Sequence, residues 1–302
     1  MPSAAPDVYL HGWLILDKPV GIGSTPCVSA VKRALRAAGS AKHRVGHGGT
    51  LDPLASGVLP IAIGEATKLA GRMLDATKQY DFTVRFGEET STLDTEGDVI
   101  ATSAVRPSPE QTQAVLPQFT GPLEQVPPAY SALKIDGKRA YHLARAGEEV
   151  ALQSRRVIIH SLSIIECSRD TATFSATVSK GTYIRSLARD IAQALGTVGH
   201  VTMLRRTKAG PFHLSQAITL DFLEETAKAR TLDGAVLPLV AGLDDIPALP
   251  VTPEDALLLR QGRQLLGFRV SPGPYLATDD DRPVAMVEAS DSGLRVVRGF
   301  NI

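Results

Sequence analysis

The densest group of residues able to do chemistry lies between positions 44 and 57. It reads Arg44-Val-Gly-His-Gly-Gly-Thr-Leu-Asp-Pro-Leu-Ala-Ser-Gly57 and places four glycines around His47 and Asp52. Glycine permits tight turns and the close approach of a partner to the backbone. An ionised carboxylate in such a setting can act as a nucleophile. The stretch is therefore a candidate functional loop, in which His47 and Asp52 are the side chains able to do chemistry.

Other sites that such a stretch can form are a phosphate loop and a zinc site. A phosphate loop requires a Gly-Lys-Ser/Thr end, which is absent here. His43 and His47 are four residues apart, but no third zinc ligand follows in a fitting pattern and the glycines disfavour a helix. Both readings are rejected, and no metal site is predicted.

Each candidate residue also has an ordinary structural explanation. An Asp before a proline, as in Asp52-Pro53, often caps a helix, and spacing alone favours that role. Tyr80 suits a core or edge aromatic. Arg185 stands at the start of an amphipathic helical pattern, where a surface charge is usual.

Composition is that of an ordinary globular protein. The chain has 302 residues, of which 43% are hydrophobic and 21% charged. It has no run of eighteen apolar residues and no signal-peptide pattern at its start, so we expect no membrane span and a cytoplasmic location. Cys27 and Cys167 are far apart and have no Cys-x-x-Cys neighbour, which suits buried thiols in a reducing compartment.

Charge is neutral in total but unevenly distributed. Positions 18–51 hold six Lys or Arg and no acid, and positions 180–210 hold six more against a single acid, Asp190. The compensating acids concentrate in positions 75–110 and 221–245. A protein of this kind can present a basic face to phosphates although its net charge is zero. The pattern is compatible with a nucleic-acid partner without requiring one.

Helical and strand patterns alternate along the chain without a repeated period. Positions 13–16, 80–86, 157–165 and 172–179 read as strands. Positions 26–38 read as a helix with Thr25 as its N-cap, a capping box opens another at Ser108, and an apolar helical stripe runs over 184–195. We expect an α+β fold with a mixed, largely antiparallel central sheet flanked by helices.

Two segments look like additions to this main domain, which we place at residues 1–245. The first, at about 124–153, carries Pro127-Pro128, aromatic-type side chains and several basic residues, and reads as an excursion from the sheet. The second follows the proline-rich stretch that begins at Ile246. Residues 246–302 are too few for a large core, so a small β-rich module is expected.

The chain resembles the bacterial tRNA pseudouridine-55 synthases, the TruB family, over roughly its first seven tenths. The resemblance rests on motifs in the family's order: Leu16-Asp-Lys-Pro19, Val45-Gly-His-Gly-Gly-Thr-Leu-Asp-Pro-Leu-Ala-Ser-Gly57, Gly64-Glu-Ala-Thr-Lys68, Lys78-Gln-Tyr80, Pro128-Ala-Tyr-Ser-Ala-Leu-Lys134, Lys180-Gly-Thr-Tyr-Ile-Arg185 and Leu204-Arg-Arg206. It implies the pseudouridine synthase fold. The tail looks like a reduced version of the RNA-binding PUA-type module that ends these enzymes.

The resemblance also implies roles. Asp52 would be the nucleophile, attacking the target uridine at ribose C1′ or uracil C6, after which the uracil detaches, rotates and rejoins through C5. Tyr80 would stack on the extruded base near C5, and Arg185 would pair with Asp52. Substrate contacts are predicted for four residues (His47, Tyr183, Leu204 and Lys18). As a separate hypothesis, RNA contacts are predicted for five more (Tyr130, Lys134, Lys138, Arg139 and Arg205).

Physical chemistry is consistent with these roles. An opposite charge favours the ionised form of a carboxylate, and arginine stays charged and holds an acid at two points. Extruding a base costs roughly a few kcal/mol, so RNA readers prefer loops, which fits a T-loop substrate. The excursion at 124–153 would clamp the T-arm of tRNA, and the basic residues between Lys18 and Arg44 would meet phosphates.

Two further functions remain as alternatives to the enzyme. One is a tRNA-folding chaperone without turnover, which needs neither Asp52 nor Tyr80 and could coexist with catalysis. The other is a structural subunit of a ribonucleoprotein, disfavoured because the chain lacks lysine-rich extensions. The sequence predicts a monomer that acts on tRNA with no cofactor and no obligate protein partner.

Overall fold

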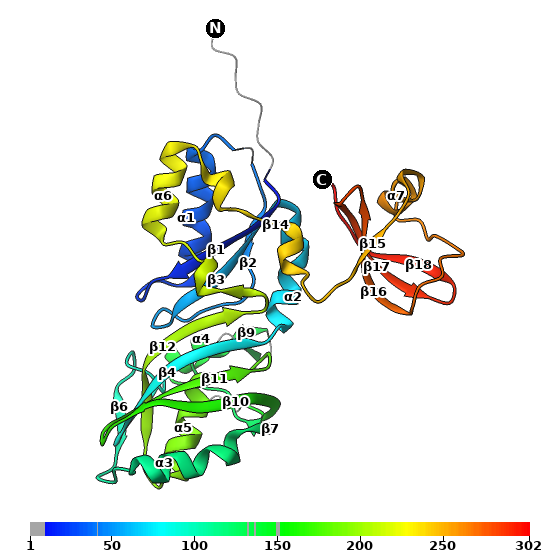
Figure 1. Ribbon diagram of the computed structural model, residues 1–302. Helices are drawn as coiled ribbons and strands as arrows, with labels where there is room; N and C mark the ends of the chain where they lie inside the picture. The colour runs from blue at the N-terminus through cyan, green and yellow to red at the C-terminus, as the bar shows by residue number, and fades with distance from the viewer. Residues whose placement is uncertain (1–9, 41, 132, 136, 149–151) are drawn as a thin grey trace.

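The computed structural model describes residues 10–40, 42–131, 133–135, 137–148 and 152–302 (Figure 1). Its main feature is a sheet of ten strands in the order β14-β1-β3-β12-β4-β11-β10-β7, with β2 paired to β3 and β13 paired to β12. Among the described strand pairs of this sheet, β3–β12 is parallel and the others are antiparallel. The prediction of a mixed, largely antiparallel sheet is therefore confirmed. In chain order the strands are β1 (Gly12–Lys18), β2 (Val45–His47), β3 (Ser56–Ile63), β4 (Lys78–Phe86), β7 (Gly121–Gln125), β10 (Arg155–Cys167), β11 (Thr171–Val178), β12 (Gly199–Ala209), β13 (Phe212–His213) and β14 (Leu237–Pro238).

Helices flank the sheet, with α1 and α6 beside β1 and with α3 and α5 beside the β4–β7 half (Figure 1). The helices are α1 (Ser24–Ala37), α2 (Ala70–Asp75), α3 (Pro109–Val115), α4 (Ala140–Arg145), α5 (Ile184–Ala194), α6 (Leu220–Ala229) and α7 (Pro253–Arg260), with short 3-10 turns η1 (Gly64–Leu69), η2 (Leu116–Phe119), η3 (Leu214–Gln216), η4 (Leu232–Ala235) and η5 (Leu239–Gly242). Within the described residues, no helix is both long and apolar enough to cross a membrane.

The ends of two helices test the predicted caps. Ser108 forms the predicted capping box with Gln111 at the start of α3. The predicted cap at Thr25 is wrong, because α1 begins at Ser24 and Gly23 occupies the N-cap without a side-chain bond. The hydroxyl of Ser24 is instead engaged by the backbone of Leu51, so this helix start is tied to the loop that precedes Asp52.

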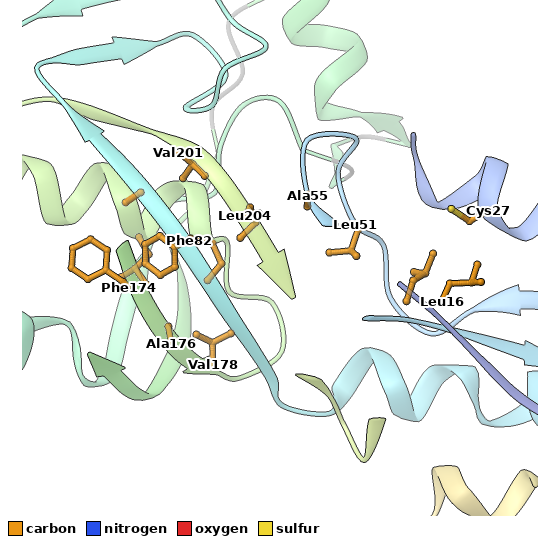
Figure 2. Close-up of a cluster of buried hydrophobic side chains, with 14 of the residues drawn as sticks. Leu16, Cys27, Leu51, Ala55, Phe82, Phe174, Ala176, Val178, Val201 and Leu204 are labelled. Atoms are coloured by element: carbon orange, nitrogen blue, oxygen red, sulfur yellow. The ribbon is translucent and has the colours of Figure 1, made fainter. Parts of the chain in front are cut away.

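The main core lies between the sheet and these helices and reaches the Asp52 loop. Phe82 and Phe174 stack across β4 and β11 with ring centroids 5.3 Å apart. Leu51 and Ala55, on either side of Asp52, are buried in the same core. Figure 2 shows the labelled side chains running from Phe82 through Leu51 to Leu16. The loop is thus anchored at two points by apolar burial.

The predicted excursion leaves the sheet where β7 ends at Gln125 and returns where β10 begins at Arg155, and these two residues are paired. It contains a hairpin of β8 (Lys134–Ile135) and β9 (Lys138–Arg139), followed by α4. A second small hairpin, of β5 (Glu88–Thr90) and β6 (Val99–Thr102), follows β4.

The tail forms a four-stranded sheet of its own: β15 (Ala248–Pro250), β16 (Gly273–Asp279), β17 (Arg282–Ser290) and β18 (Gly293–Gly299). Helix α7 packs on it around a separate core. Phe300 joins the apolar cluster around Trp13, and Lys68 donates to the carbonyl of Gly299 at 2.8 Å. The expected β-rich module is confirmed, while the boundary at residue 246 stays a prediction.

Candidate active site

Asp52 lies in a turn between β2 and β3. Its carbonyl accepts a hydrogen bond from the amide of Ala55 at 3.1 Å, and no helix follows, so the helix-cap explanation for Asp52 is wrong. The side chain is 41% exposed, and its Oδ2 lies 2.9 Å from the guanidinium of Arg185. The carboxylate is therefore held by a cation and still accessible.

Arg185 is buried in the first turn of α5, with only 5% of its side chain exposed. Besides Asp52 it contacts Asp94 at 3.2 Å and donates to the carbonyls of Thr92 and Tyr130 at 2.8 and 2.9 Å. The surface-charge explanation for Arg185 is therefore wrong. Its two terminal nitrogens each contact one carboxylate and one carbonyl: Nη1 contacts Asp94 and Thr92, and Nη2 contacts Asp52 and Tyr130. This arrangement fixes the direction in which the guanidinium meets Asp52.

Asp94 is a residue that sequence reasoning missed. Its side chain is 2% exposed, and it accepts hydrogen bonds from the Thr92 hydroxyl and from the amide of Glu96. The stretch from Ser91 to Asp98 is short, polar and acidic, which is also the pattern of an ordinary solvent-exposed turn. The sequence therefore scarcely indicates that Asp94 belongs to the site. Its contact with Arg185 distinguishes it from the neighbouring acids.

Two cavities meet at the Asp52–Arg185 pair. The smaller, about 320 Å³, brings together three of the predicted residues, Tyr80, Tyr183 and Leu204. The larger, about 1020 Å³, is lined by residues of the Asp52 loop, the 91–98 loop and the excursion, including His47, Tyr130 and Tyr141. The first has the size and mixed apolar and polar lining of a small-ligand pocket. The second is an open groove leading to the same carboxylate.

The walls of the smaller cavity are held from several elements. Tyr80 is half-buried on β4, and Leu204 is 7% exposed on β12. Tyr183 precedes α5, where its backbone exchanges two hydrogen bonds with the side chain of Gln125 at 2.8 and 3.1 Å. The guanidinium of Arg155 lies 4.5 Å from the Tyr183 ring centroid. These aromatic and aliphatic groups suit a flat ring.

Positive charge surrounds this cavity. Burial, and then the charge of Arg206, lowers the pKa of Lys78 to about 8. The ammonium group of Lys78 donates to the carbonyls of Leu74 and Ala76, at the end of α2.

His47, which lines the larger cavity, is affected by the same cation. Burial, and then the charge of Arg206, lowers the pKa of His47, whose Nδ1 is buried with no hydrogen-bond partner among the described residues. The imidazole of His47 is therefore held neutral.

Lys18 does not occupy the place that was predicted for it. Its side chain is fully buried, and its ammonium group donates to the carbonyls of Pro19, Ile22 and Pro53 at 2.9, 2.6 and 3.4 Å. Burial lowers its pKa. Direct contact of Lys18 with a substrate does not fit this geometry, because the ammonium faces the turns that flank it.

The predicted RNA-contact residues are dispersed. Tyr130 lines the larger cavity, and Lys138 is exposed on the hairpin of the excursion. Arg205 is partly exposed and held in two-point contact by Asp17 at 3.1 and 2.7 Å. The side chains of Lys134 and Arg139 lie outside the described part of the structure. Among the residues described, no group of three or more His, Cys, Asp or Glu side chains could hold a metal ion.

Comparison with known proteins gives two family models and several relatives. Residues 32–184 match the model of the TruB family pseudouridylate synthase N-terminal domain, and residues 185–244 match the tRNA pseudouridylate synthase B C-terminal domain. A protein of Novosphingobium aromaticivorans named tRNA pseudouridine synthase B is 60% identical over 298 residues, covering 97% of this chain and 98% of its own. One of the same name from Zymomonas mobilis is 56% identical, covering 99% of each chain.

Among solved structures, an H/ACA RNP bound to a substrate RNA containing 2′-deoxyuridine is similar with a TM-score of 0.73. The match covers 97% of this chain and 86% of that one at 23% identity. At this identity the likeness concerns the fold, and it confirms the expected pseudouridine synthase fold.

Replacing Asp94 by Asn should lower the free energy of unfolding because Arg185 loses one of its two charged partners. We expect a loss of about 2–3 kcal/mol, below the roughly 3–5 kcal/mol typical when a buried pair is broken outright. The matched control is Asp170→Asn, since Asp170 pairs with Arg106 but is 64% exposed; it should cost less than about 1 kcal/mol. Denaturant unfolding of both variants measures this, and equal losses would contradict the assigned role of Asp94.

His47 should make the protein less stable in mild acid. Its pKa is lowered by folding, so below about pH 6.5 the unfolded chain binds a proton that the folded chain does not, and stability falls as pH falls. His47→Gln should reduce the difference in unfolding free energy between about pH 7.5 and about pH 5.5. The exposed His160 provides the control, as His160→Gln. A difference that His47→Gln leaves unchanged would contradict this explanation.

Proposed function

The chain belongs to the TruB family of pseudouridylate synthases, and on this basis we propose that it converts uridine 55 in the T-loop of tRNA to pseudouridine with Asp52 as the nucleophile. The observation that carries the site assignment is the accessible Asp52 carboxylate paired with buried Arg185 at the junction of two cavities. The choice of tRNA is supported by the names of the 60% and 56% identical relatives.

The smaller cavity provides the place for the target base. Tyr80 lies on one wall and Tyr183 and Leu204 on others, so a flat uracil ring would be enclosed by aromatic and aliphatic groups beside Asp52. A base reaches such a pocket only after leaving its stack, which costs roughly a few kcal/mol and is cheapest in a loop. The larger groove, beside His47 and Tyr130, would receive the RNA strand that carries this base.

The reaction begins with attack of the Asp52 carboxylate on C1′ of the ribose or C6 of the uracil. In either route the C1′–N1 bond breaks and a C1′–C5 bond forms, while N1 gains a proton and C5 loses one. The bond between Asp52 and C1′ or C6 breaks again before the product leaves, which restores the carboxylate. Atoms and electrons balance because product and substrate are isomers, and no oxidant or reductant enters. Arg185 pairs with the carboxylate at 2.9 Å and aims it before attack. Tyr80 lies in the wall of the same cavity, where we place it near C5.

Binding of the tRNA involves surfaces beyond the two cavities. The excursion would clamp the T-arm from one side, with Lys138 exposed on its hairpin. Action as a monomer without an obligate partner protein stays a prediction. Because the substrate is tRNA, we place the enzyme in the cytoplasm. A tRNA-folding activity would use the same binding surface and stays a prediction.

Asp52→Asn tests the proposal with unmodified tRNA transcript. Wild-type protein should convert one T-loop uridine, mapped by chemical adduct formation and primer extension. The variant should bind the transcript with an unchanged Kd and lose at least about 10³-fold in rate, because it lacks the nucleophile.

Asp170→Asn, which changes an exposed aspartate away from both cavities, should retain wild-type activity. Conversion by Asp52→Asn at the wild-type rate would contradict the assignment of the nucleophile. Binding by every protein without conversion by any would favour a tRNA-folding protein, and conversion of a uridine outside the T-loop would contradict the choice of substrate.

A further inference from the structure

Arg206 is a buried arginine in the lining of the smaller cavity, and the reaction described above assigns it no role. It lies on β12 with 1% of its surface exposed. Its Nε donates to the carbonyl of Val58 at 2.7 Å, and its two terminal nitrogens donate to the carbonyls of Thr50 and Gly49 at 3.3 and 3.1 Å. Within the described residues, no carboxylate forms an ion pair with it. Burying a cation against carbonyls alone is unfavourable, so the arrangement calls for a reason beyond stability.

The three carbonyls belong to the two arms of the Asp52 loop. Gly49 and Thr50 lie just before Asp52, whereas Val58 lies after it on β3. The planar guanidinium therefore connects the two arms through their backbone carbonyls. The backbones of Gly57 and Arg206 also pack directly against each other. A Cβ on Gly57 would lie 2.2 Å from the carbonyl oxygen of Arg206, so no side chain fits there.

A second buried side chain holds the loop from the side of α1. Ser24 is 3% exposed, and its Oγ accepts a hydrogen bond from the amide of Leu51 at 2.8 Å and donates to the carbonyl of the same residue at 3.1 Å. Lys18 adds a contact to the carbonyl of Pro53. Backbone groups on both sides of Asp52 are thus occupied by buried side chains, while the Asp52 carboxylate faces the cavities.

We propose that Arg206 is a positioning residue of this enzyme, which together with Ser24 fixes the 49–58 loop so that the Asp52 carboxylate is presented in one orientation to the substrate. The inference rests on the proposed function for its catalytic consequence. Arg206 acts through the backbone and does not touch the carboxylate. Arg206 would contribute to the rate by fixing the position of the nucleophile, since a displacement of about 1 Å can lower a reaction rate by about 10²-fold.

The fork of donors makes arginine necessary at this place. One guanidinium reaches three carbonyls on two arms, whereas a lysine at position 206 would provide a single point charge on a flexible stem. Arg206→Lys therefore keeps the charge and removes the bridge. A role limited to charge would survive this change, and a role in binding RNA would appear in the Kd rather than in the rate.

The first experiment measures single-turnover pseudouridine formation at saturating tRNA, together with the Kd for tRNA. Arg206→Lys should lower the rate between about 10-fold and 10²-fold while the Kd stays within about twofold. Ser24→Ala, a smaller change, should lower the rate less. The double variant should fall short of the product of the two effects, because both residues hold one loop. Arg85→Lys on β4, exposed and away from the loop, should leave the rate unchanged.

The second experiment needs no substrate and so separates this inference from the proposed function. Hydrogen exchange of the free protein should show faster exchange of the Leu51 and Ala55 amides in Arg206→Lys, with α5 unchanged. Ser24→Ala removes the acceptor of the Leu51 amide itself, so in this variant the Ala55 amide is the readout and should exchange faster. This variant serves if Arg206→Lys does not fold. The proposal is overturned if the loop amides exchange at the wild-type rate in Ser24→Ala and in any folded Arg206→Lys. It is also overturned if Arg206→Lys changes the Kd for tRNA and leaves the single-turnover rate unchanged. A wild-type protein that modifies no tRNA would overturn the proposed function alone.

Discussion

The structure of the site depends on one buried cation. Arg185 is almost fully enclosed, and a charge in that position costs several kcal/mol unless it is paired and fully hydrogen-bonded. Asp52, Asp94 and the carbonyls of Thr92 and Tyr130 satisfy it, and they come from segments that are distant in sequence. The loop with Asp52, the 91–98 loop, the excursion and α5 must therefore all be in place before the guanidinium is satisfied, which makes the site a product of the whole main domain.

The sheet supplies the rigid frame for this pair. The parallel contact of β3 with β12 places the Asp52 loop beside the strand that carries Leu204 and Arg206. Apolar burial of Leu51 and Ala55 anchors the loop in the core, and the buried side chains of Ser24 and Arg206 engage its backbone. What remains accessible is the carboxylate. The same frame that stabilises the fold therefore supports the proposal that the Asp52 carboxylate is presented in one orientation.

Much of this could be predicted from the sequence, and the exceptions have physical causes. The spacing of apolar residues predicted the fold class, and the glycines around Asp52 predicted a loop with tight turns at that place. Asp94 was missed because its burial depends on a contact with Arg185 that no local pattern records. Lys18 looks like a surface cation, yet carbonyls of two turns converge on it. Arg205 and Arg206 are adjacent on a strand and point to opposite faces. Because both are arginines, the sequence does not indicate which of the two side chains is buried.

The most direct test of the account changes Arg185 to Lys and measures the single-turnover rate of pseudouridine formation at saturating tRNA. Lysine keeps the charge beside Asp52 but cannot divide planar donors between two carboxylates and two carbonyls. We expect normal binding of tRNA by Arg185→Lys and a rate lower by about 10²-fold or more, because the carboxylate is no longer held in position. A wild-type rate in Arg185→Lys would contradict the claim that this ion pair orients the nucleophile.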